Sequence, residues 1–105
     1  MPVVRPLNEA PMNNEEAIAL LESELALIRA VPYEELVSRM STGSLNFERV
    51  GPSGAKYQVE FQVFWDGRRG GNIRVMGSID DGGWRAFVPL NRDFIKAPDN
   101  SFVGE

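Results

Sequence analysis

The sequence predicts an α+β fold in which two N-terminal helices pack on one face of a four- to five-stranded antiparallel meander sheet. Apolar residues recur at helical spacing up to about residue 40, and they alternate with polar residues from residue 44 onward. Short stretches rich in Gly, Pro, Asn and Asp separate the alternating segments, as turns do. The chain has 105 residues, of which 43% are hydrophobic, which fits a single domain. We expect residues 1–12 to form an extended arm and residues 13–105 to form that domain.

Two segments show the pattern of amphipathic helices. The first is expected from Asn14 to about Ala30, because Asn13 or Asn14 can cap its free N–H groups and two glutamates follow in the first turn. The second is expected from Pro32 to about Met40, because proline fits the first turn of a helix. The first helix is predicted to pack across the inner face of the sheet through Leu21, Leu25 and Ile28.

The strongest strand pattern covers residues 56–65, in which apolar and polar residues alternate without interruption. A second strand follows from Ile73 to Ile79. Asp81-Gly82 is a favoured two-residue hairpin turn, and it predicts a third strand over residues 84–88 in which Trp84 pairs with Ile79 and Val88 pairs with Val75. Residues 94–96 and 101–103 are expected to form a short terminal hairpin.

Register then assigns side chains to the outer face, which points away from the helices. Val63 is expected opposite Val75, and Phe61 opposite Gly77, which leaves three large apolar residues and two arginines outside. They are Phe64, Met76, Phe87, Arg74 and Arg85. Exposed apolar clusters mark interaction surfaces, so we expect a homodimer through this face. The alternatives are that the N-terminal arm or the terminal hairpin covers it, or that a ligand or another protein binds there.

Arginines around a glycine-rich loop suggest a second kind of site. The run Gly67-Arg68-Arg69-Gly70-Gly71 exposes N–H groups beside basic side chains, which suits an anion. It lacks the Lys-Ser/Thr ending of a phosphate-binding loop, so a solvated hairpin loop is also consistent with it. A small-ligand or anion-binding domain that uses Arg68, Arg69, Arg74 and Arg85 is therefore the alternative function.

The residue inventory argues against catalysis and metal binding. The chain contains neither His nor Cys, so the commonest general base, metal ligand and thiol nucleophile are missing. We expect no catalytic residue, no metal and no cofactor. Hairpin chemistry accounts for Asp80-Asp81-Gly82-Gly83, which lacks the spacing of a calcium loop. An enzyme that relies on carboxylates alone is the third hypothesis for the function, after the self-associating module and the ligand-binding domain.

Charge and hydropathy bear on partners and location. The net charge of −4 argues against nucleic-acid binding. The chain has no apolar run near the roughly 20 residues that span a bilayer and no pattern of a signal peptide, so we expect a cytoplasmic protein without membrane contact.

The last part of the chain carries a resemblance. Residues 78–105, with the sequence SIDDGGWRAFVPLNRDFIKAPDNSFVGE, are similar to the C-terminal part of small uncharacterised bacterial proteins of unknown function. The resemblance implies no activity, cofactor or functional residue. The function predicted from the residues is a non-enzymatic interaction module that associates with itself, with bacterial immunity or antitoxin-like proteins as one plausible setting.

Overall fold

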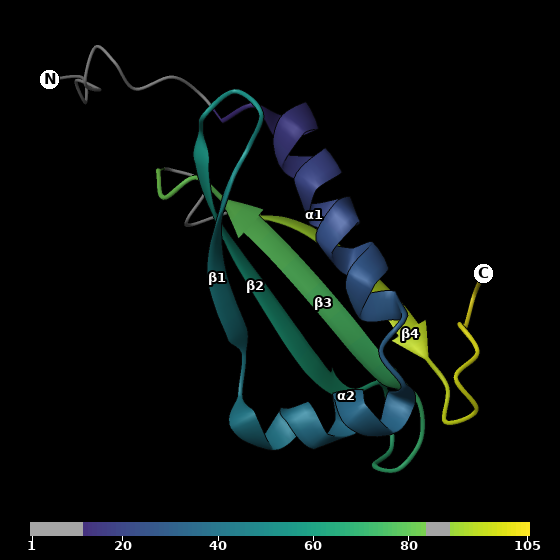
Figure 1. The fold of residues 1–105 in the computed structure, drawn as a ribbon. Coiled ribbons are helices and arrows are strands. Elements are labelled where there is room, and N and C mark those ends of the chain that lie inside the picture. The colour runs from purple at the N-terminus through teal and green to yellow at the C-terminus, as the bar shows by residue number, and fades with distance from the viewer. Residues whose placement is uncertain (1–11, 84–88) are drawn as a thin grey trace, which may run out of the picture.

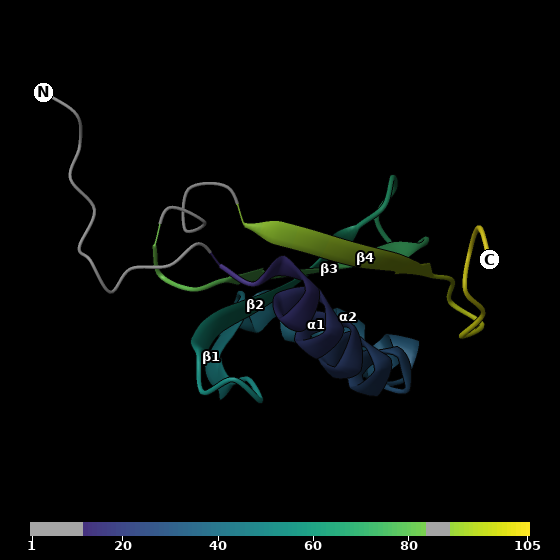
Figure 2. The ribbon, with the colours of Figure 1, turned by 90° about the horizontal axis from the view of Figure 1, so that it is seen from above.

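The computed structural model describes residues 12–83 and 89–105, and it confirms the α+β class. Within these residues two helices precede a four-stranded antiparallel sheet, whose strands follow one another in the order β1-β2-β3-β4 (Figure 1). The elements are α1 (Asn14–Arg29), α2 (Tyr33–Arg39), the 3₁₀ turn η1 (Met40–Thr42), β1 (Leu45–Val50), β2 (Lys56–Trp65), β3 (Ile73–Asp80) and β4 (Leu90–Lys96). Both helices lie on the same side of the sheet, which curls around α1 (Figure 2).

Helix α1 begins where its sequence can satisfy the free N–H groups. The Asn13 side chain accepts a hydrogen bond from the Glu16 N–H at 3.1 Å, and Glu15 and Glu16 stand at the positive end of the helix dipole. The helix packs on β3 and β4. Neither described helix is long and apolar enough to cross a lipid bilayer.

Gly77 on β3 lets α1 approach the sheet closely. A Cβ atom at this position would lie 2.6 Å from the Phe61 ring and 3.0 Å from a Leu21 methyl group, so any larger residue would push the helix or the ring away. The predicted pairing of Gly77 with Phe61 is confirmed. The core around them is made of Ala17, Leu21, Leu25, Tyr33, Leu36, Tyr57, Val59, Phe61, Ile73, Val75, Ile79 and Phe94.

The register of β3 with its next neighbour corrects the sequence prediction. Ile79 pairs with Leu90 and Val75 pairs with Phe94, so β4 takes the place that was predicted for residues 84–88. Residues 84–88 themselves lie outside the described residues. Gly82 has the expected positive φ of 79°, but Asp81-Gly82 is not a two-residue hairpin, because the connection between β3 and β4 runs from residue 81 to residue 89.

Two physical reasons explain this difference. The Asp80 and Asp81 carboxylates accept hydrogen bonds from the Gly82 and Gly83 N–H groups at 2.7 and 3.0 Å, and such local bonds compete with a tight hairpin. In addition, Trp84 and Leu90 are an even number of positions apart. Either residue opposite Ile79 therefore puts large apolar residues of its strand on the inner face, Leu90 and Phe94 in the case of β4, and alternation alone cannot distinguish the two registers.

Glu16 fastens the β1–β2 connection to the start of α1. Its carboxylate accepts hydrogen bonds from the Ser53 hydroxyl at 2.6 Å, from the Ser53 N–H at 3.0 Å and from the Tyr57 hydroxyl at 2.7 Å. The hydrogen bonds from Ser53 and Tyr57 lower the pKa of the Glu16 carboxyl. Burial, with the hydrogen bond to Glu16, raises the pKa of the Tyr57 phenol to about 12.

Replacing Leu21 with Ala should lower the free energy of unfolding by about 2–5 kcal/mol, because Leu21 is fully buried between α1 and the sheet. Leu27→Ala is the matched control, since Leu27 lies on the same helix and is 69% exposed; its effect should stay within about 0.5 kcal/mol. Urea unfolding of both variants measures the difference. Equal effects would contradict the packing of α1 described above.

Between pH 10 and 12 the free energy of unfolding should fall less in Tyr57→Phe than in the wild type. Above pH 10 the unfolded chain releases the phenolic proton, while the folded chain keeps it until about pH 12. The stabilisation that the Tyr57 phenol provides is therefore fully present below pH 10 and is lost as the pH rises from 10 to 12. The free energies of unfolding of wild type and variant, measured in urea from pH 8 to 12, should therefore converge above pH 10. A constant difference across that range would show that Tyr57 does not keep its proton.

Candidate functional site

The outer face of the sheet is the strongest candidate for a functional surface. Figures 1 and 2 show α1 and α2 on the opposite face, and no described helix or strand lies over this one. Its side chains on β2, β3 and β4 are Lys56, Gln58, Glu60, Gln62, Phe64, Arg74, Met76, Ser78, Asp80, Asn91, Asp93 and Ile95. Most of them are polar, as expected for a solvated face.

Three apolar side chains gather at the end of this face that adjoins the β2–β3 loop. Phe64, Arg74 and Ile95 pair across β2, β3 and β4, and Met76 lies on the same face two positions along β3. Diagonal neighbours of this kind are within reach of long side chains. Phe64 is 37% exposed, and Met76 and Ile95 are half-buried. We call these three residues, Phe64, Met76 and Ile95, the outer patch.

The structure changes part of the predicted interface. Phe64, Met76 and Arg74 lie together as predicted, whereas Phe87 and Arg85 lie outside the described residues. Ile95 takes the position on the third strand that was predicted for other residues, because β4 pairs with β3. The sequence pattern could have found Ile95 only if the register of β4 had been known.

The aromatic side chain of the terminal turn lies on the helix side of the sheet and not on the outer patch. Phe102 packs its ring against Phe94 on the helix side, with the two ring centroids 5.7 Å apart. The Arg29 guanidinium of α1 lies 4.0 Å from the centroid of the Phe102 ring. Phe102, the largest side chain of the terminal turn, therefore does not cover the patch, while Val103 donates its N–H to the Ile95 carbonyl at 2.9 Å beside it. Covering by the N-terminal arm would involve residues 1–11, which lie outside the described residues.

Arg74 is held by two carboxylates beside the outer patch. Its Nε and Nη2 atoms donate to Asp66 Oδ1 at 3.1 and 3.0 Å, and its Nη1 atom donates to Asp93 Oδ2. Asp93 and Asp66 raise the pKa of the guanidinium, so it stays charged. Because two carboxylates balance its charge and take three of its five N–H donors, Arg74 has little attraction left for an anion.

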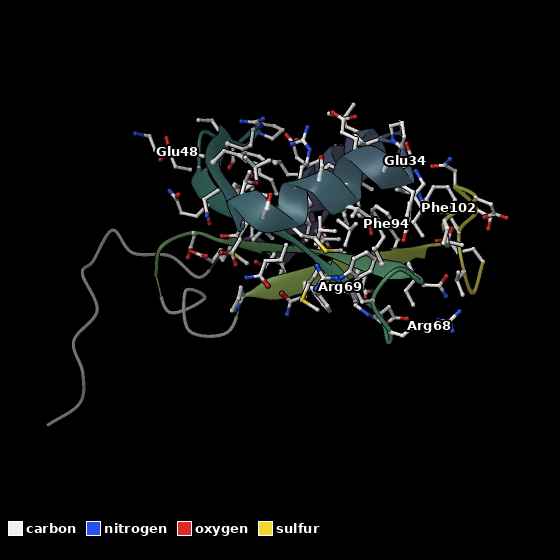
Figure 3. All side chains as sticks on the ribbon, turned by 90° about the horizontal axis from the view of Figure 1, so that it is seen from below. Glu34, Glu48, Arg68, Arg69, Phe94 and Phe102 are labelled. Atoms are coloured by element: carbon white, nitrogen blue, oxygen red, sulfur yellow. The ribbon has the colours of Figure 1, made fainter. Side chains whose placement is uncertain are left out.

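The loop between β2 and β3 carries Arg68 and Arg69, two further arginines of the predicted anion site, whose fourth member, Arg85, lies outside the described residues. The Asp66 N–H donates to the Asn72 carbonyl at 2.8 Å and closes the loop, and Gly70 has a φ of 85° that suits glycine. Figure 3 shows Arg69 beside the sheet and Arg68 farther out, pointing away from it. Arg68 and Arg69 point in different directions, and Arg74 is already paired with Asp66 and Asp93, so this geometry gives little support to an anion site.

The described residues do not assemble recognisable catalytic machinery. Glu60 faces Ser78, and Ser78 faces Asn91, so the serine has one carboxylate and neither an imidazole nor an amine opposite it on its neighbouring strands. No group of three or more Asp or Glu side chains in residues 12–83 and 89–105 could hold a metal ion. Every buried side-chain nitrogen or oxygen in that part of the chain has a hydrogen-bond partner, so none is held ready for a ligand.

A hollow that no sequence pattern predicted lies on the helix side of the sheet. It has a volume of about 310 Å³ and lies between the α1–α2 corner, η1 and the inner face of the sheet. We call it the helix-side cavity. Its position depends on how α2 crosses the end of the sheet, and no local sequence pattern specifies that angle.

In comparisons with known proteins, no protein-family model, no curated protein and no solved structure matches the chain.

Proposed function

We propose that this domain is a non-enzymatic interaction module that associates with itself through the outer patch. One observation carries the proposal. Both helices cover the same face of the sheet, and the other face presents Phe64, Met76 and Ile95 together. Fully burying an exposed side chain of this size gains roughly 1.5–3 kcal/mol, and these three, which are already partly buried, would each gain a part of that on contact with a partner.

Symmetry makes a second copy a suitable partner for so small a patch. A twofold axis through the patch brings the same three side chains from each copy together, which doubles the apolar surface. The charges beside the patch do not oppose this, because Arg74 is compensated by Asp66 and Asp93 within the same chain. Two copies can therefore approach without bringing an uncompensated cation from each side together.

The expected dimer is a weak one. Stable interfaces bury about 800 Å² on each partner, and three apolar side chains cover only part of such an area. The sheet curls around α1, so its outer side is convex (Figure 2), and a convex surface limits the area that a second copy can contact. A weak, exchangeable contact also suits a module whose patch meets a different protein, as in the immunity or antitoxin-like setting.

Replacing Phe64 with Asp should shift the protein toward monomer, because a charge in the centre of the contact would have to be desolvated. Sedimentation equilibrium over a wide concentration range should show a dissociation constant at least tenfold weaker than that of the wild type. Leu27→Asp is the matched control, since Leu27 is exposed on the helix side and its replacement should leave association unchanged.

Circular dichroism keeps this test interpretable. Both variants should retain the wild-type spectrum, because Phe64 and Leu27 are exposed and neither belongs to the core. A wild-type chain that stays monomeric at millimolar concentration would overturn self-association. So would a dimer that is disrupted by Leu27→Asp and not by Phe64→Asp.

A further inference from the structure

The helix-side cavity has the size and the walls of a small-molecule site. Its volume of about 310 Å³ falls at the lower end of the range for ligand pockets, and about 150 Å³ of apolar space is enough to hold benzene. Aliphatic and aromatic side chains make its walls, and they come from both layers of the fold. They are Ile28, Val31 and Leu36 on the helix side and Phe61, Val63 and Val75 on the sheet side.

The cavity opens to solvent at a rim of polar side chains. Arg39 at the end of α2, Thr42 in η1 and Ser44 before β1 contribute to the lining, and all three are exposed. Gly43 between them has a φ of 82°, and a Cβ atom there would meet nothing within 4 Å, so the rim is not crowded. An apolar interior with a few polar groups at one side is typical of sites that bind and orient small ligands.

Arg39 supplies the only formal charge among the described residues that line this cavity. Its one partner in the described part of the chain is Glu35, at 3.5 Å across one turn of α2, and both side chains are about half exposed. Exposed pairs of this kind contribute little, so Arg39 can exchange Glu35 for another carboxylate at small cost. This differs from Arg74, whose guanidinium is held by two carboxylates at once.

Apolar surface is also exposed at the opening of the helix-side cavity, where a bound ligand would cover it. Helix α1 packs mainly on β3 and β4 and reaches the far end of β1 through the Glu24–Arg49 ion pair, at 2.6 Å. Leu45, the first residue of β1, lines the cavity and is 46% exposed. An apolar ligand that displaces water from this position gains the free energy of removing that surface from solvent.

We propose that the helix-side cavity binds a small amphiphile with a carboxylate head. The apolar chain or ring lies against Ile28, Val63 and Leu45, which are half-buried or exposed, and the carboxylate meets the Arg39 guanidinium at the rim, where the Ser44 hydroxyl is within the lining as a further donor. A guanidinium matches a carboxylate with two parallel hydrogen bonds, which favours this head group over a neutral or cationic one. This site is separate from the outer patch, because it lies on the opposite face of the sheet.

Octanoate titrated into the full-length protein tests the proposal, with amide chemical shifts as the readout. Octanoate should shift the amide signals of residues 39–45 in a saturable way, and octylamine, which has the same chain with a positive head, should bind at least tenfold more weakly. Arg39→Gln should reduce that preference for octanoate. Arg69→Gln is the matched control, because it removes the same charge from a loop outside the cavity.

A second variant tests the apolar part of the site. Val63→Trp should fill the cavity and abolish the shifts, while Phe64→Asp on the neighbouring position of β2 should leave octanoate binding unchanged, since its side chain lies on the outer face. If Val63→Trp does not fold, the comparison of head groups in wild type and Arg39→Gln still decides.

Three outcomes would overturn the proposal. Octanoate could cause no saturable shifts, as would happen if a second copy or another part of the chain filled the cavity. The shifts could instead map to the outer patch and disappear in Phe64→Asp. Octanoate and octylamine could also bind equally well, which would remove the role of Arg39.

Discussion

The buried ammonium of Lys96 is the interaction on which the arrangement of helices and sheet depends. Lys96 lies on β4, is 3% exposed, and donates from Nζ to the carbonyls of Arg29 and Val31 at 2.8 and 2.7 Å. These carbonyls stand where α1 ends and have no partner within the helix. Burial lowers the pKa of the Lys96 ammonium, and the charge of Arg29 adds to the effect. The two carbonyls offset part of the cost of desolvation, and the same bonds join α1 to β4.

The end of the chain completes this junction. The Asn100 side chain accepts a hydrogen bond from the Tyr33 N–H at 2.8 Å, at the first residue of α2, and Glu105 accepts from Arg29 at 2.9 Å. The Tyr33 hydroxyl in turn donates to the Gly71 carbonyl at 2.6 Å. The corner between the helices is thus fixed from β4, from the terminal turn and from the β2–β3 loop. Because these contacts set the direction of α2, they also shape the helix-side cavity beneath it.

Lys96 also shows where sequence reasoning succeeded and where it failed. Local periodicity was enough to predict α1, β2, β3 and the β2–β3 register, because each depends on apolar residues that recur within one segment. The partner of β3 depended on contacts far apart in sequence, such as those of Phe94 and Lys96 with α1. A lysine in an alternating segment indicates a solvated position, so nothing local suggests that Lys96 is buried. Because the register of the strand beside β3 was predicted wrongly, Phe87 was predicted as the third apolar residue of the outer face where the structure has Ile95. The helix-side cavity was not predicted.

The sheet separates the two proposed sites although they share a strand. Val63 lines the helix-side cavity and Phe64 belongs to the outer patch, and successive side chains of a strand point to opposite faces. The cavity combines an apolar interior with the loosely paired Arg39, which suits one small anionic molecule. The outer patch combines apolar side chains with the compensated Arg74, which suits a second protein surface. Because a substitution at either position alters one face and leaves the side chains of the other in place, association and ligand binding can be tested separately in this chain.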